Sequence, residues 1–113
     1  MRPPDDRTSY TPLEVDRRTL HESPQAERLL ALSASFPTLR GVLDRWDPEA
    51  LDRWACGPVP GSGAFHAAAF CLSVYNADAP WQCGPFDLQR ALGTWDAAHR
   101  AAFLAWVRAP WWP

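Results

Sequence analysis

Residues 87–108, DLQRALGTWDAAHRAAFLAWVR, carry the strongest periodic pattern in the chain. Their apolar side chains recur at alternating spacings of three and four residues, at Leu88, Leu92, Trp95, Ala102, Phe103 and Trp106. That spacing places them on one face of an α-helix. Gly93 interrupts the pattern at a cost of roughly 1 kcal/mol relative to alanine, so we expect either one long helix or two with a bend at this glycine. Residues 103–107 are apolar on every side, and we expect protein to surround that end of the helix.

Upstream of this segment, prolines mark where helices begin. In Thr11-Pro12, Ser23-Pro24 and Asp47-Pro48 a residue that favours the N-cap precedes a proline. Proline suits the first helical position because its missing N–H would have no partner there. These pairs predict three helix starts. Phe36-Pro37 predicts a break, followed by a further helix around Leu39, Val42, Leu43 and Trp46.

The middle of the chain contains a loop and then an apolar run. Residues 57–63, GPVPGSG, favour no regular structure and predict a loop that divides the domain into two halves. Residues 64–75 are almost entirely apolar, and the alanines at 67–69 favour a buried helix. A minor β element over residues 69–75 stays open as an alternative, because a short apolar run fits both structures.

The length of 113 residues suits one domain with one core, since two domains would leave neither with enough interior. We expect residues 1–11, which are polar and contain prolines, to form a flexible N-terminal arm. Residues 12–113 are then a single helical domain. The expected fold is all-α, a compact bundle of five to six short helices with the C-terminal helix, about 87–108, at its centre.

Composition bears on compartment and origin. The three cysteines cannot all pair within one chain, and no N-terminal signal peptide or apolar run long enough to span a membrane is visible. We therefore expect a soluble cytoplasmic protein without a membrane partner. Every basic residue is arginine and isoleucine is missing, a usage typical of a high-GC coding sequence and hence of a bacterium or its phage.

Five residues are candidate metal ligands: His66, Cys71, Cys83, Asp96 and His99. Asp96 and His99 are three residues apart, the spacing by which a helix presents two ligands to one metal. Zinc sites are usually built from closer pairs such as Cys-x-x-Cys, and none is present. The sequence thus predicts no metal and no cofactor, with these residues as the weak candidates for a metal-dependent enzyme.

Other chemistry finds little support. No nucleophile elbow or phosphate-binding glycine loop occurs, and Cys56 is predicted at a helix C-terminus, where the dipole opposes a thiolate. The carboxylates of Asp44, Asp47, Glu49 and Asp52 alternate with arginines and are interpreted as a solvated surface. A net charge of −2 disfavours nucleic acid, so a nucleic-acid-binding regulator is the alternative rather than the main hypothesis. We expect no enzymatic activity and no catalytic residue.

The tryptophans point instead to a protein partner or a homodimer. Trp111 and Trp112 at the chain end form an apolar area too large to leave in water, and Arg108 precedes them. Together with the loop residue Trp81 they are the predicted partner-binding residues, since tryptophan and arginine are common at binding hot spots. The competing interpretation is that the pair folds back and fastens the last helix to its own domain.

Residues 110–113, Pro-Trp-Trp-Pro, also spell the name of a chromatin-reading domain family. In that family the motif belongs to a β-barrel and most of the domain follows it. In this chain it comes last and follows a predicted helix, so we treat the match as accidental.

Overall fold

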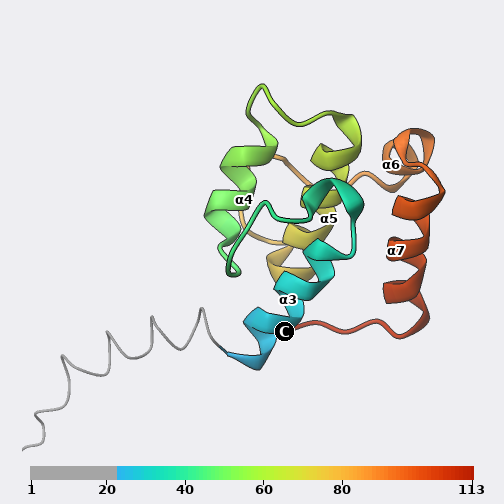
Figure 1. Ribbon diagram of the computed structural model, residues 1–113. Helices are drawn as coiled ribbons and strands as arrows, with labels where there is room; N and C mark the ends of the chain where they lie inside the picture. The colour runs from blue at the N-terminus through green and yellow to red at the C-terminus, as the bar shows by residue number, and fades with distance from the viewer. Residues whose placement is uncertain (1–22) are drawn as a thin grey trace, which may run out of the picture.

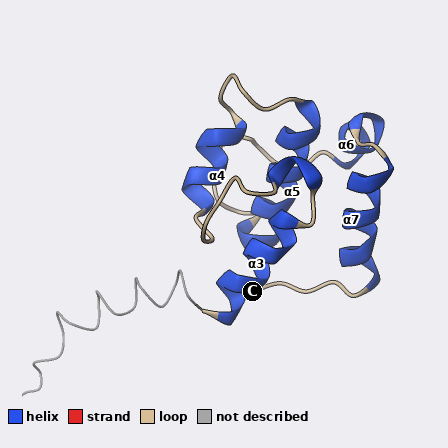
Figure 2. Ribbon diagram, viewed as in Figure 1, coloured by secondary structure: helices blue, strands red, loops and turns tan. Residues whose placement is uncertain are grey.

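The computed structural model describes residues 23–113, so the expected arm at 1–11 and the helix start at Thr11-Pro12 lie outside the described residues. The described part is helical and contains no strand (Figures 1 and 2). This confirms the all-α class. The elements are α3 (Pro24–Ala34), the 3-10 turn η1 (Pro37–Leu39), α4 (Pro48–Ala55), α5 (Ser62–Asn76), α6 (Leu88–Thr94) and α7 (Ala97–Arg108). No helix in this part is long and apolar enough to cross a membrane.

Side-chain caps fix the helix starts as expected. The Ser23 hydroxyl accepts the Ala26 N–H at 3.1 Å, and the Asp47 carboxylate accepts the Ala50 N–H at 3.1 Å. Each bond satisfies a backbone donor that the first helical turn leaves without a partner. The helices predicted at Ser23-Pro24 and Asp47-Pro48 are confirmed.

The helix predicted around residues 39–46 is wrong. After Phe36, the chain makes only the short turn Pro37–Leu39. Gly41 then adopts a φ of 77°, a left-handed conformation that a helix cannot continue through. Leu39 and Trp46 are nevertheless buried. Their apolar pattern therefore arises because an irregular segment is buried, and not because a helix forms.

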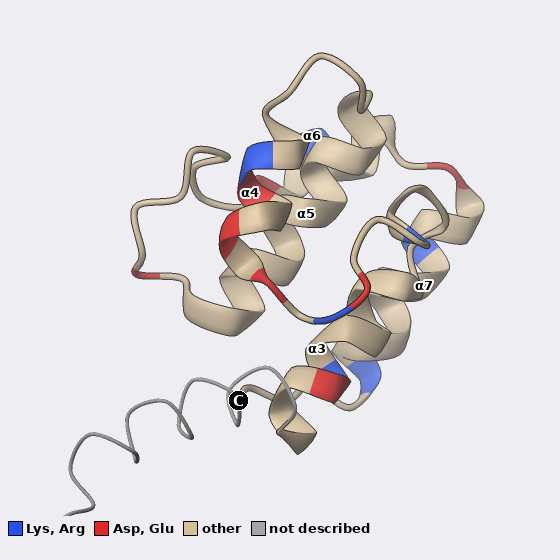
Figure 3. Cartoon of the chain, turned by 60° about the vertical axis from the view of Figure 1, so that its left-hand side comes forward, with Lys and Arg blue, Asp and Glu red and all other residues tan. Residues whose placement is uncertain are grey.

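The central helix is α5, which corrects the expectation that 87–108 occupies the centre. It packs against α3, η1, α4 and α6. It carries no charged residue, as its uniformly tan ribbon in Figure 3 shows, and Ala67 and Ala68 are fully buried. The alanines of α5 let neighbouring helices approach closely, whereas 87–108 carries several charged residues. The β alternative at 69–75 is excluded because these residues lie within α5.

The C-terminal segment forms two helices, and the break falls beyond Gly93. Trp95 is extended (φ −71°, ψ 141°) and buried, and the Asp96 carboxylate caps α7 by accepting the His99 N–H at 2.9 Å. The break between the two helices therefore lies at Trp95 and Asp96, because Trp95 is buried and Asp96 caps the next helix. α7 lies at the edge of the molecule (Figure 1) and packs inward through Phe103 and Trp106.

The expectation that protein surrounds residues 103–107 is also wrong for the single chain. Leu104 is 45% exposed and Val107 is 43% exposed. Because α7 is peripheral, only one of its faces can be covered by the rest of the chain. Its outer apolar residues therefore remain on the surface.

Candidate functional site

Of the two C-terminal tryptophans, Trp111 returns to the domain. The tail runs from the end of α7 back to the start of α3 (Figure 1). The guanidinium of Arg28 on α3 lies over the Trp111 ring, 4.1 Å from its centroid, and the Trp106 indole N–H donates to the Trp111 carbonyl at 3.1 Å. A cation over an aromatic face is attracted by the ring quadrupole. These contacts connect the tail to both α3 and α7.

Trp111 also closes a shallow groove of about 320 Å³ between α3 and α7. Small side chains line the two walls, Ala31 and Ser35 from α3 and Ala102 and Ala105 from α7. The groove exists because these short side chains do not fill the space between the helices.

Trp112 behaves differently from its neighbour. Its side chain is 64% exposed, although one edge contacts Trp106 with the ring centroids 5.3 Å apart and the planes at 89°. Arg108, in the last turn of α7, is exposed beside this tail. The structure therefore separates the predicted pair into one residue packed on its own domain and one that faces solvent.

Most of the large exposed apolar side chains of the described chain lie between residues 88 and 112. They are Leu88, Leu92, Leu104, Val107 and Trp112, and the remaining one is Val59 in the loop between α4 and α5. Scattered exposed apolar residues are normal in proteins, whereas their concentration on one segment indicates a surface for contact.

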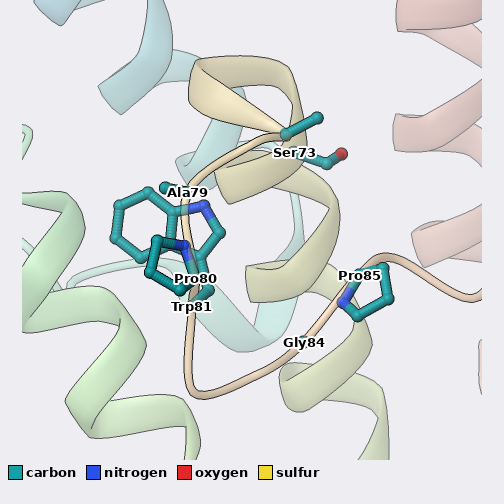
Figure 4. Close-up of a pocket in the computed structure, with 7 residues that line it drawn as sticks. Ser73, Ala79, Pro80, Trp81, Gly84 and Pro85 are labelled. Carbon is teal, nitrogen blue, oxygen red and sulfur yellow. The ribbon is translucent and has the colours of Figure 1, made fainter.

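Trp81, the fourth predicted contact residue, lies away from this segment. It lies in the loop after α5 and packs against the C-terminal end of that helix, where its indole N–H donates to the Asn76 carbonyl at 2.8 Å and its ring lies 6.2 Å from that of Tyr75. It lines a pocket of about 320 Å³ with Ser73, Pro80 and Pro85 (Figure 4). Trp81 therefore packs the loop against α5.

The structure brings Asp96 and His99 together at the start of α7, where Asp96 caps the helix. The His99 Nδ1 donates to the Asp96 carboxylate at 2.7 Å, and its Nε2 lies 2.8 Å from the Thr38 hydroxyl. Since an ionised carboxylate only accepts, Nδ1 carries a proton, and Nε2 shares a hydrogen bond with the Thr38 hydroxyl. The His99 backbone N–H, followed by its ring, lowers the pKa of Asp96. Both ring nitrogens are occupied, which removes His99 from the candidate metal ligands.

The other weak metal candidates do not converge on this pair. Cys71 is fully buried in α5, and burial raises the pKa of its thiol. His66 packs its ring against Phe65, with the centroids 5.4 Å apart. Within residues 23–113, Cys83 alone of the five joins a cluster of ligand atoms.

That cluster also contains Asp52 and Cys56, which were not among the five predicted metal candidates. Ligand atoms of Asp52, Cys56 and Cys83 all lie within 4.8 Å of one another. Asp52 is 6% exposed, which corrects its interpretation as part of a solvated acidic surface. The available signal was the spacing of four between Asp52 and Cys56, which places both on one face of α4. The partner Cys83, 27 positions beyond Cys56, carries no such signal.

Comparisons with protein-family models, curated proteins and solved structures gave no significant match. The functional argument accordingly rests on the chain's own geometry.

Proposed function

We propose that this chain is a non-enzymatic protein–protein interaction module that self-associates through the outer face of α7 and Trp112. The observation that carries the proposal is the concentration of exposed apolar side chains on the C-terminal segment, where Leu104, Val107 and Trp112 are 43–64% exposed. Covering such side chains in an interface stabilises the assembly by the hydrophobic effect.

A second copy of the chain fits this face in an antiparallel arrangement. Ala97, Ala101, Leu104 and Arg108 follow one another along the outer face of α7 at spacings of three and four. The alanines at the N-terminal end leave room for the larger residues at the C-terminal end of a partner helix. Such pairing is isologous, so the same contacts form twice about a two-fold axis.

Charge supports the same arrangement. The Asp96 side chain at the start of α7 is 70% exposed, and Arg108 at its end is exposed as well. Antiparallel pairing about residue 102 brings each Arg108 to the Asp96 of the other copy. It also places the positive N-terminal end of each helix dipole beside the negative C-terminal end of the other, which is favourable. A parallel arrangement would instead place like charges together.

Two matched variants test the proposal. Leu104→Arg places a charge in the middle of the face, and Val59→Arg makes the same change at an apolar residue that is 83% exposed in another part of the chain. We expect Leu104→Arg to raise the dimer Kd by at least about tenfold, equivalent to about 1.4 kcal/mol, and Val59→Arg to leave it unchanged. Sedimentation velocity over a concentration series measures both. Equal dimerisation of the two variants would exclude this face.

We also propose that the module works in the cytoplasm of a bacterium with a high-GC genome. The odd number of cysteines and the exclusive use of arginine as the basic residue support this placement. Immunodetection in cytoplasmic and envelope fractions of the source cells tests it, and recovery in the envelope fraction would contradict it.

A further inference from the structure

A cluster of potential metal ligands lies where α4 meets the loop between α5 and α6. Asp52 and Cys56 come from α4, and Cys83 comes from the loop. The two sulfur atoms are 3.8 Å apart. The cluster is separate from the proposed contact face on α7.

Backbone hydrogen bonds hold the cluster in position. The Asp52 carboxylate accepts the Gln82 N–H at 2.9 Å through one oxygen and the Cys83 N–H at 3.0 Å through the other. These bonds fix Cys83 opposite Cys56 before any ion binds. Each carboxylate oxygen can accept at two lone-pair positions, so both keep capacity for a cation.

The charge balance of the cluster favours a cation. Asp52 is buried, and within residues 23–113 no arginine or histidine lies at ion-pair distance from its carboxylate. A divalent ion would offset the charge of the buried carboxylate and of the two thiolates that form when Cys56 and Cys83 coordinate it.

We propose that Asp52, Cys56 and Cys83 bind one zinc ion. Zinc prefers tetrahedral sites with thiolate and carboxylate ligands, and two thiolates on one zinc stand about 3.8 Å apart because each Zn–S bond is about 2.3 Å long. The observed sulfur separation already matches this value. Two thiolates select zinc over magnesium or calcium, which prefer oxygen ligands. Cys56 is exposed, so the fourth position opens to solvent and takes a water molecule.

Proton release gives the binding a clear signature. Each thiol loses its proton as its Zn–S bond forms, and no electron is transferred. Zinc binding near neutral pH therefore releases about two protons per ion. Calorimetric titration of the reduced, chelator-treated full chain with zinc chloride, in two buffers of different ionisation enthalpy, measures both the stoichiometry and the protons released. We expect one zinc per chain and about two protons.

Variants locate the site. Cys56→Ser changes an exposed side chain and should preserve the fold while weakening zinc binding by at least about tenfold and lowering proton release to about one. Asp52→Asn should also weaken binding, and its thermal unfolding shows whether the loop remains in place. Cys71→Ala is the matched control, since this cysteine lies in the core and should leave zinc binding unchanged.

Three results would overturn the proposal. The first is a wild-type chain that shows no saturable zinc binding. The second is a folded Cys56→Ser variant that binds zinc as tightly as the wild type. The third is a Cys56–Cys83 disulfide that forms in air at the same rate with and without zinc, which would assign the pair to redox chemistry.

Discussion

The guanidinium of Arg28, near the start of α3, lies 4.1 Å from the ring centroid of Trp111, three residues beyond the end of α7. This contact joins two ends of the described chain across the α3–α7 groove. The two C-terminal tryptophans therefore differ in their surroundings, because Trp111 is packed on the domain while Trp112 is 64% exposed.

This division predicts opposite effects of two alanine substitutions. Trp111→Ala should lower the free energy of unfolding by about 2 kcal/mol, roughly half the loss seen for fully buried tryptophans, since Trp111 is only partly buried. Trp112→Ala should leave monomer stability within about 0.5 kcal/mol and weaken self-association. Urea unfolding at low protein concentration measures the first effect. A larger stability loss for Trp112→Ala than for Trp111→Ala would reverse the assignment.

The cap of α7 predicts a pH dependence. The pKa of Asp96 is lowered from its ordinary value of 3.8, chiefly by the His99 N–H. Its ionised form thus stabilises the fold above the unfolded pKa, and this contribution is lost as pH falls through the lower folded pKa. We expect the Tm of the wild type to drop more steeply as the pH falls below 3.8 than that of Asp96→Asn, whose amide still caps the helix but does not titrate. Parallel Tm curves would show that the carboxylate charge does not stabilise α7.

The thiols should differ in reactivity. In the reduced, metal-free protein Cys56 is exposed, whereas Cys71 and Cys83 are buried and burial raises their thiol pKa values. Since the thiolate is the reactive form, a disulfide reagent at neutral pH should modify Cys56 rapidly and the others only on unfolding. Peptide mapping after a short exposure identifies the modified residue. Rapid modification of Cys71 would show that α5 opens easily.

The sequence correctly predicted the helix starts at Ser23-Pro24 and Asp47-Pro48, whereas the helix predicted after Phe36-Pro37 did not form. Ser23 and Asp47 cap their helices through bonds within three residues, which is why composition alone reveals them. The sequence did not predict which helix lies at the centre of the fold. Residues 87–108 do not form one continuous apolar face, because the chain breaks at Trp95 and Leu88 and Leu92 are exposed, and the uncharged α5 takes the centre.

The candidate sites also combine features that the local sequence can predict with features that depend on long-range contacts. The exposure of Trp112 and Arg108 and the spacing of Asp52 and Cys56 could be anticipated locally. The approach of Cys83 to Cys56 depends on the loop after α5 returning to α4, and Asp52 secures it through two backbone bonds. Such long-range contacts have no signature in a single sequence.

We propose that the outer face of α7 joins two copies of this chain. Sedimentation equilibrium of the unmodified protein, across concentrations from low to high micromolar, is the sharpest test of this interface because it gives mass without reference to shape. We expect a mass that rises from one chain to two and stops there, as a closed two-fold interface requires. A mass of one chain at every concentration would contradict it, and so would growth beyond two chains.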